Sequence, residues 1–166
     1  MFNTFLRENK IVAALLAALR VYLGYAWFSA GLGKIQAGFD ASGFIKGAIA
    51  NPVKGPDGGV VYGWYVDFLQ NVALPNIDLF NVLVPWGELL VGLGLMIGCL
   101  TTAAMFFGLV MNFAFFFAGT VSHNPTDILF GFIILAAGAN AGKYGLDHYV
   151  LPYINKLTNR KAQTQN

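Results

Sequence analysis

Four long apolar stretches dominate the sequence, and each predicts a helix. They cover residues 11–33, 80–98, 102–119 and 128–144. Their apolar positions run continuously instead of alternating, which favours helices over the strands of a membrane barrel. A helix needs about 20 residues to cross a hydrocarbon core of about 30 Å. The first three stretches are long enough, and the fourth only if its polar end is included. We therefore expect an all-α fold, a four-helix transmembrane bundle.

The segments outside these stretches predict shorter helices and a polar tail. Residues 36–79 form the longest loop, and within it residues 60–69 place apolar side chains at helical spacing. This pattern is typical of an amphipathic helix at a membrane interface. Residues 42–46 suggest a second short helix. These helices either anchor the loop on the membrane surface or form a lid over a site. The tail, residues 145–166, is polar and is expected to fray at its end.

The composition excludes several classes of protein. Apolar residues make up 57% of the 166 residues and charged residues only 11%, whereas soluble domains carry about 25% charged residues. So few charges cannot cover the surface of a soluble domain, and so many apolar residues exclude disorder. Basic residues exceed acidic ones by only two, so no nucleic-acid partner is predicted. The single cysteine, Cys99, excludes an intrachain disulfide and any multi-cysteine metal site.

Basic residues near the predicted spans indicate how the chain is oriented, because cytoplasmic loops carry an excess of Lys and Arg. The first stretch follows basic residues as a signal peptide does, but its length and the Arg20 in its middle favour a retained span. With both termini cytoplasmic, six basic residues lie inside and three outside, which favours this orientation. The inner residues are Arg7, Lys10, Lys143, Lys156, Arg160 and Lys161, and the outer ones are Lys34, Lys46 and Lys54.

Three polar residues interrupt the predicted spans. At 1.5 Å per residue, Arg20 and Asn112 lie about 14 and 15 Å from the inner ends of their stretches and Glu88 about 12 Å from the outer end of its own, so all three are expected near the membrane midplane. An Arg20–Glu88 ion pair would neutralise both charges, and the guanidinium could also donate to Asn112. One interpretation is a fastener that fixes helix register. The other, compatible one is a catalytic site for a quinone headgroup or its protons.

A second polar group is expected at the outer end, where it would bind substrate. Lys34 closes the first stretch, Trp86 lies just inside the second, His123 lies in an outer loop and Asp127 opens the fourth stretch. Asp127 also fits a helix N-terminus, and Lys34 fits a snorkelling lysine. Lys34 and His123 could together attract an anion. The other histidine, His148, would lie across the membrane from His123, so the two cannot ligate one haem, and no metal site is predicted.

Several short motifs, in order, resemble the DoxX/DoxD group of small four-helix bacterial membrane proteins, which are inner-membrane and multi-pass. They are Arg20-(x)3-Gly24-(x)6-Gly31-x-Gly33-Lys34, Trp86-Gly87-Glu88-Leu89-(x)2-Gly92, Thr101-Thr102-Ala103-Ala104, Asn124-Pro125 and Ala141-Gly142-Lys143-Tyr144-Gly145-Leu146-Asp147. The last two resemble the DoxD branch more closely, the large subunit of thiosulfate:quinone oxidoreductase. That resemblance implies oxidation of thiosulfate outside the cell, membrane quinone as electron acceptor, and a smaller redox partner subunit.

The leading hypothesis is a membrane subunit of a quinone-linked oxidoreductase that oxidises thiosulfate or a related sulfur compound. Arg20, Glu88 and Asn112 would be its catalytic site, below the outer substrate-binding group. No flavin, haem or paired-cysteine motif is visible to accept electrons from sulfur. Two alternatives follow: a non-enzymatic scaffold that recruits a redox partner to the lipid bilayer, and a small-solute transporter. Stripes of small residues leave a homo-oligomer open as well.

Overall fold

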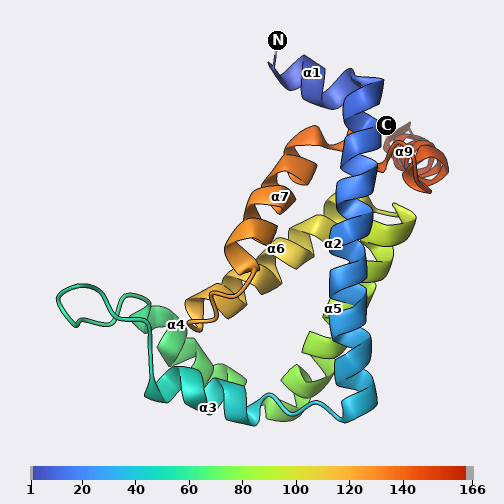
Figure 1. Cartoon of the computed structure of the whole chain (residues 1–166). Helices are drawn as coiled ribbons and strands as arrows, with labels where there is room; N and C mark the ends of the chain where they lie inside the picture. Colours follow the sequence, from blue (N-terminus) through green and yellow to red (C-terminus); the bar gives the residue numbers. More distant parts are fainter. Residues whose placement is uncertain (1, 164–166) are drawn as a thin grey trace.

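The computed structural model describes residues 2–163, and helices are the main secondary structure of this part of the chain, as predicted (Figure 1). An isolated β-bridge joins Lys54 and Val60 in the longest loop. The helices are α1 (Phe2–Glu8), α2 (Lys10–Ala37), α3 (Ser42–Ala50), α4 (Gly63–Phe68), the π-helix η1 (Leu69–Ala73), α5 (Ile77–Ile97), α6 (Thr101–Phe117), α7 (Asn124–Ala137), α8 (Ala139–Gly142) and α9 (Asp147–Gln163).

The four predicted apolar stretches correspond to α2, α5, α6 and α7. By length and composition, α2 with 28 residues and α5 with 21 could cross a membrane, whereas the apolar helices α6 and α7 have 17 and 14 residues. The fourth stretch ends earlier than residue 144, because Gly138 adopts φ 57° and ψ −130° and interrupts the helix. Gly138 thus separates α7 from the single turn of α8.

Close backbone contact joins α2 to α5, which run side by side in opposite directions (Figure 1). A Cβ atom on Gly24 would lie 2.8 Å from the Gly92 carbonyl oxygen, and one on Gly31 would lie 2.7 Å from the Pro85 carbonyl oxygen. Larger side chains would separate the helices, so these glycines form the contact surface between α2 and α5. The pair α6 and α7 diverges from α2 and α5 towards α3 and α4 (Figure 1).

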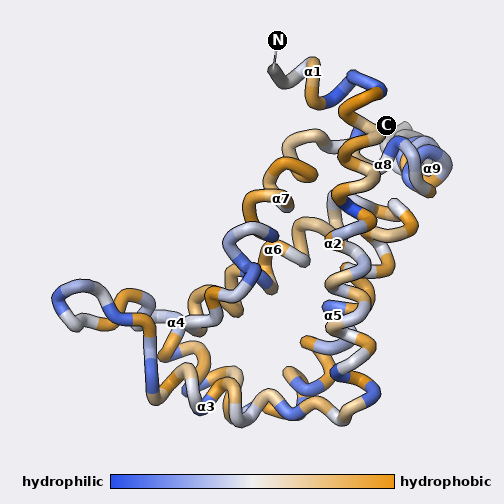
Figure 2. The backbone as a smooth tube through the Cα atoms, in the orientation of Figure 1, coloured by the Kyte–Doolittle hydropathy of each residue, from blue (hydrophilic) through white to orange (hydrophobic). Residues whose placement is uncertain are grey.

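The two ends of the molecule are built differently. Helices α1 and α9 lie at one end and α3 and α4 at the other (Figure 1). The short helices α3 and α4 overlap the two predicted in the long loop. The tail is polar, as expected, and residues 147–163 of it form helix α9; the predicted fraying at residues 164–166 lies outside the described residues. Figure 2 shows hydrophobic residues along α2, α5, α6 and α7, and more hydrophilic ones in α9 and the loop before α4.

Candidate functional site

Arg20 does not form the expected ion pair with Glu88. It is buried, and its guanidinium donates instead to backbone carbonyls at the end of α5 and around α8. The acceptors are the carbonyl oxygens of Leu95 at 2.5 Å, Met96 at 2.9 Å, Tyr144 at 2.7 Å and Ala141 at 3.1 Å. Carbonyls at helix C-termini have no partners within the helix and carry partial negative charge. Arg20 therefore supplies hydrogen-bond donors to backbone carbonyl oxygens at the ends of helices.

The packing register of α2 and α5 explains why the predicted pair is absent. Gly31 of α2 packs against Leu89 of α5, so Glu88 lies level with Gly31. Gly31 is eleven residues, or about 16 Å along the helix, from Arg20. Arg20 lies beside Gly98, where a Cβ would be 2.6 Å from Cζ of the guanidinium. A depth counted along each helix separately ignores how far α2 and α5 are shifted relative to each other along their axes. The prediction of a common depth for Arg20 and Glu88 was wrong for that reason.

Arg20 belongs to an inner polar cluster that also contains Asn140 and Asp147. The Asp147 carboxylate accepts hydrogen bonds from the backbone amides of Leu100 at 2.6 Å and Thr101 at 2.9 Å. It thereby caps the start of α6. The Asn140 amide donates to two carbonyls near the N-terminus, those of Leu6 at 2.9 Å and Asn9 at 3.1 Å. The cluster fastens the ends of α2, α5, α6 and α9 together.

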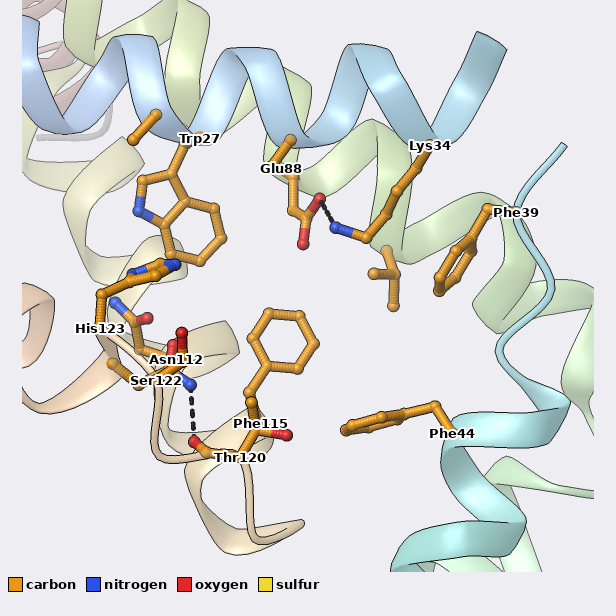
Figure 3. A pocket seen from close by; sticks show the side chains of 14 residues that line it. Trp27, Lys34, Phe39, Phe44, Glu88, Asn112, Phe115, Thr120, Ser122 and His123 are labelled. Carbon is orange, nitrogen blue, oxygen red and sulfur yellow. Dashed lines mark hydrogen bonds and ion pairs between the residues drawn. The ribbon is translucent and has the colours of Figure 1, made fainter. Parts of the chain in front are cut away.

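The other predicted polar residues gather around a cavity of about 300 Å³, which we call the outer pocket. It lies between α2, α5, α6 and the loop before α7. Figure 3 shows Lys34 and Glu88 on one side and the loop residues Ser122 and His123 on the other. Three aromatic rings, those of Phe39, Phe44 and Phe115, line the pocket toward α3.

Within the outer pocket, Lys34 instead of Arg20 forms the ion pair with Glu88. The Lys34 Nζ lies 2.6 Å from Oε2 of Glu88. Glu88 is buried, and Lys34 is partly exposed. The lysine, expected at an outer entrance, reaches back along α2 because its long side chain spans the distance from the helix end. The pair neutralises the buried carboxylate and leaves its second oxygen without a hydrogen bond to the described part of the chain.

Two more polar groups at the outer pocket have no hydrogen-bond partner among residues 2–163. Asn112 has 0% exposure, and neither its amide nitrogen nor its amide oxygen is paired; the indole Nε1 of Trp27 is also unpaired. Both side chains line the cavity (Figure 3). A buried polar group without a partner costs about 1–3 kcal/mol. Two donor groups and one acceptor thus stay unpaired in side chains that line the cavity.

His123 and Asp127 form a pair at the edge of the outer pocket. His123 Nδ1 lies 2.5 Å from Asp127 Oδ2, one turn further along α7. The loop before them is tightly bent, since Ser122 has φ 36° although it is not glycine. Asn124 holds the loop through a 2.8 Å hydrogen bond from its side chain to the Thr120 carbonyl. Asp127 thus orients His123 in addition to opening α7.

Trp86 lies away from the outer pocket, on the exposed face of α5. Residues two apart on a helix point about 200° apart, so Trp86 and Glu88 cannot face the same cavity. The sequence predicted Trp86 at the site and did not predict Trp27. Trp27 and Lys34 are seven residues apart, and this spacing places them on the same face of α2. Nothing in the phenylalanine-rich run 113–117 distinguishes Phe115 from its neighbours.

Comparisons with known proteins identify the family. No curated protein and no protein of known structure matches the sequence. The sequence model of the DoxX family matches residues 15–120, more than half of the chain. The matched region runs from α2 to the loop after α6, so it includes Trp27, Lys34, Glu88 and Asn112. The family membership, with two long apolar helices, indicates a membrane protein: the chain belongs to the DoxX family.

Proposed function

We propose that the chain crosses a bacterial inner membrane four times, through α2, α5, α6 and α7. Large apolar side chains are exposed along all four helices, which fits contact with lipid. Helices α6 and α7 would reach about 25 and 21 Å at 1.5 Å per residue, and tilt or local thinning accommodates short spans. Examples of the exposed residues are Leu15 and Tyr22 on α2, Leu83 and Leu90 on α5, Phe107 and Val110 on α6, and Leu129 and Phe132 on α7.

The same proposal places α1 and α9 on the cytoplasmic side. Both helices lie at one end of the molecule, as an even number of spans requires (Figure 1). Arg7 and Lys10 accompany α1, and Lys143 and Lys156 accompany α9, in line with the excess of basic residues in cytoplasmic segments. The outer pocket then opens near the opposite, extracytoplasmic surface.

We further propose that the outer pocket binds a quinone headgroup and that the chain is the membrane subunit of a quinone-linked oxidoreductase. The observation that carries this proposal is the unpaired Trp27 indole and Asn112 amide beside the ion pair of Lys34 with the buried Glu88. A quinone is a flat ring with carbonyl oxygens, so it accepts hydrogen bonds at its edge and stacks at its faces. The aromatic side chains of the pocket suit the faces, and the unpaired donors suit the edge.

Each side chain has a task in this proposal. A membrane quinone supplies two-electron, two-proton redox chemistry. Trp27 Nε1 and the Asn112 amide would donate to its oxygens and fix the ring, because both donors are unpaired and belong to side chains that line the cavity. Lys34 would balance negative charge on the ligand and on Glu88. Arg20, whose donors are occupied by carbonyls, is assigned a structural role in place of the catalytic one expected from the sequence.

The electron donor is a separate part of the proposal. The DoxD-like motifs support thiosulfate or a related sulfur compound, oxidised at the extracytoplasmic side together with a small partner subunit. Because no sulfur-oxidising group is evident in this chain, the partner would bring it. Membranes containing the chain and its partner should reduce quinone when thiosulfate is added. Equal reduction in membranes that lack the chain would refute the assignment of the donor.

Quinone binding is tested with 2-methyl-1,4-naphthoquinone and the full chain in lipid nanodiscs. Trp27→Phe removes the unpaired donor and keeps an aromatic ring, and Trp86→Phe makes the same change on the exposed face of α5. We expect quinone to quench tryptophan fluorescence in the wild type. The affinity, measured by calorimetry, should fall about fivefold in Trp27→Phe, the value of one hydrogen bond.

The matched control for Trp27→Phe is Trp86→Phe. Trp86→Phe should leave the affinity unchanged, because that side chain does not line the outer pocket. Equal losses in both variants would indicate nonspecific partition of quinone into the lipid. A wild type with no saturable binding would contradict the proposal itself.

A further inference from the structure

We propose that His123 is the acid–base residue of the outer pocket, with Asp127 as its positioning residue. This inference rests on the proposed quinone site and adds the group that exchanges protons with the bound molecule. Redox chemistry of a quinone moves protons as well as electrons, so its site needs a titratable group that meets both ligand and water. Imidazole is the side chain that most often exchanges protons in this way, and His123 is the histidine that lines the outer pocket.

The geometry of the His123–Asp127 pair leaves one ring nitrogen available. Nδ1 is engaged by Asp127 Oδ2 at 2.5 Å, so Nε2 is the nitrogen that a molecule in the pocket can reach. The Asp127 side chain is 8% exposed and the His123 side chain 69%. A buried carboxylate thus holds a ring that lines the cavity and also contacts water. A carboxylate on Nδ1 fixes the orientation of an imidazole and stabilises its protonated form.

The backbone around His123 is constrained as well. Ser122 adopts a left-handed φ of 36°, and Gly119 has φ 90° on the other side of the loop. Asn124 closes the loop with its bond to Thr120, and the backbone amide of Asp127 donates to the His123 carbonyl at 3.1 Å. Strained backbone persists only where surrounding contacts impose it. These contacts hold His123 at the edge of the pocket.

The other titratable groups around the pocket are already occupied. Within residues 2–163, the charged side chains that face His123 are Asp127 on its own helix, Lys34 on α2 and Glu88 on α5. Glu88 is buried and paired with Lys34, so its proton exchange with water would require breaking that pair. His123 needs no such rearrangement, because its ring is exposed.

The proton step follows from this arrangement. When the ligand takes up a proton, the Nε2–H bond of the imidazolium breaks as an O–H bond forms on the ligand. The neutral imidazole keeps Nδ1–H directed at Asp127 and regains a proton on Nε2 from water. In the opposite direction Nε2 accepts the proton of a hydroxyl and releases it to water. Asp127 keeps the ring in place throughout.

A pair of naphthoquinones tests this inference in nanodiscs. 2-Hydroxy-1,4-naphthoquinone carries an acidic hydroxyl and binds as an anion, whereas 2-methyl-1,4-naphthoquinone has no ionisable group. From about pH 5 to about pH 8, affinity for the hydroxy compound should fall about tenfold as His123 loses its proton, and affinity for the methyl compound should stay flat. His123→Gln should remove the pH dependence. Asp127→Asn should move it to lower pH.

Nuclear magnetic resonance of the imidazole provides a second readout. In a His148→Gln background, His123 is the one remaining histidine, and its titration should shift to higher pH when the hydroxy compound binds. The inference would be overturned if His123→Gln bound the hydroxy compound with the same pH dependence as the wild type. It would also be overturned if binding of this anion left the titration of His123 unchanged. Failure of both naphthoquinones to bind would instead overturn the quinone site, so the two proposals fail separately.

Discussion

The inner polar cluster and the outer pocket contain similar side chains in opposite states. At the inner end, the Arg20 guanidinium reaches four carbonyls and both Asp147 carboxylate oxygens accept backbone amides. At the outer end, Asn112 and the Trp27 indole are buried without partners beside a cavity. Saturated polar groups hold helix ends together, whereas unsatisfied ones impose a cost on the folded chain. The presence or absence of hydrogen-bond partners thus distinguishes residues that stabilise the fold from residues proposed to bind a ligand.

The glycines reinforce the same contrast. Gly98 and Gly145 pack directly on Arg20, so the guanidinium fills its site completely. The outer pocket has no such filling, because α6 and α7 diverge from α2 and α5 and aromatic rings line the gap (Figures 1 and 3). A substitution at the inner cluster should therefore act on stability, and one at the pocket should act on binding.

The largest effect is expected at Arg20. Arg20→Met removes every donor to the four carbonyls and should lower the free energy of unfolding by about 4 kcal/mol. Arg20→Lys keeps the charge on a single nitrogen and should lose about half as much. Thermal unfolding in detergent, followed by circular dichroism, measures both. An Arg20→Met variant as stable as the wild type would break the assignment of this cluster to structure.

Asp147 should show the next largest effect. Asp147→Ala leaves the backbone amides of Leu100 and Thr101 without this acceptor and should cost about 2 kcal/mol. The same unfolding assay measures it, and Asp57→Ala in the exposed loop serves as the control, with a change of less than about 0.5 kcal/mol. Equal losses in the two variants would mean that the cap on α6 contributes nothing.

Asn112 should respond in the opposite direction. Asn112→Leu replaces an unpaired buried amide with an apolar group of similar volume, so stability without ligand should stay the same or rise by about 1 kcal/mol. Chemical unfolding of the two proteins in the absence of quinone decides this. A loss of 2 kcal/mol or more would show that the amide stabilises the fold, which would erase the contrast between the two regions.

The smallest effect concerns an exposed group near the pocket. The pKa of Asp40 lies below its ordinary value because the Ser42 hydroxyl and backbone amide donate to its carboxylate. A lowered pKa in the folded state stabilises the fold above the ordinary value, and this contribution is lost as the pH falls through the lowered pKa. Ser42→Ala should move the pKa of Asp40 upward, which carboxyl-carbon resonances would reveal. An unchanged pKa would show that Ser42 is not its cause.

The sequence predicted the helices well because long apolar runs and glycine stripes are local signals. It did not predict the partner of Arg20, because the offset between two antiparallel helices depends on how Gly24, Gly31 and Gly92 pack. The same offset brings Lys34 to Glu88. Trp86 was misplaced by proximity in sequence to Glu88, although the helical turn of 100° per residue puts them on different faces. The pocket itself arises from the divergence of α6 and α7, which no local pattern encodes.

The most direct test of the contrast is the effect of 2-methyl-1,4-naphthoquinone on thermal stability in Arg20→Lys and Asn112→Leu. A ligand at 100 times its dissociation constant stabilises a protein by about 2.7 kcal/mol. We predict that quinone stabilises the wild type and the destabilised Arg20→Lys by similar amounts, and stabilises Asn112→Leu by about 1 kcal/mol less, because one hydrogen bond to the ligand is lost. Full stabilisation of Asn112→Leu, or none of Arg20→Lys, would contradict the division between structural cluster and binding pocket.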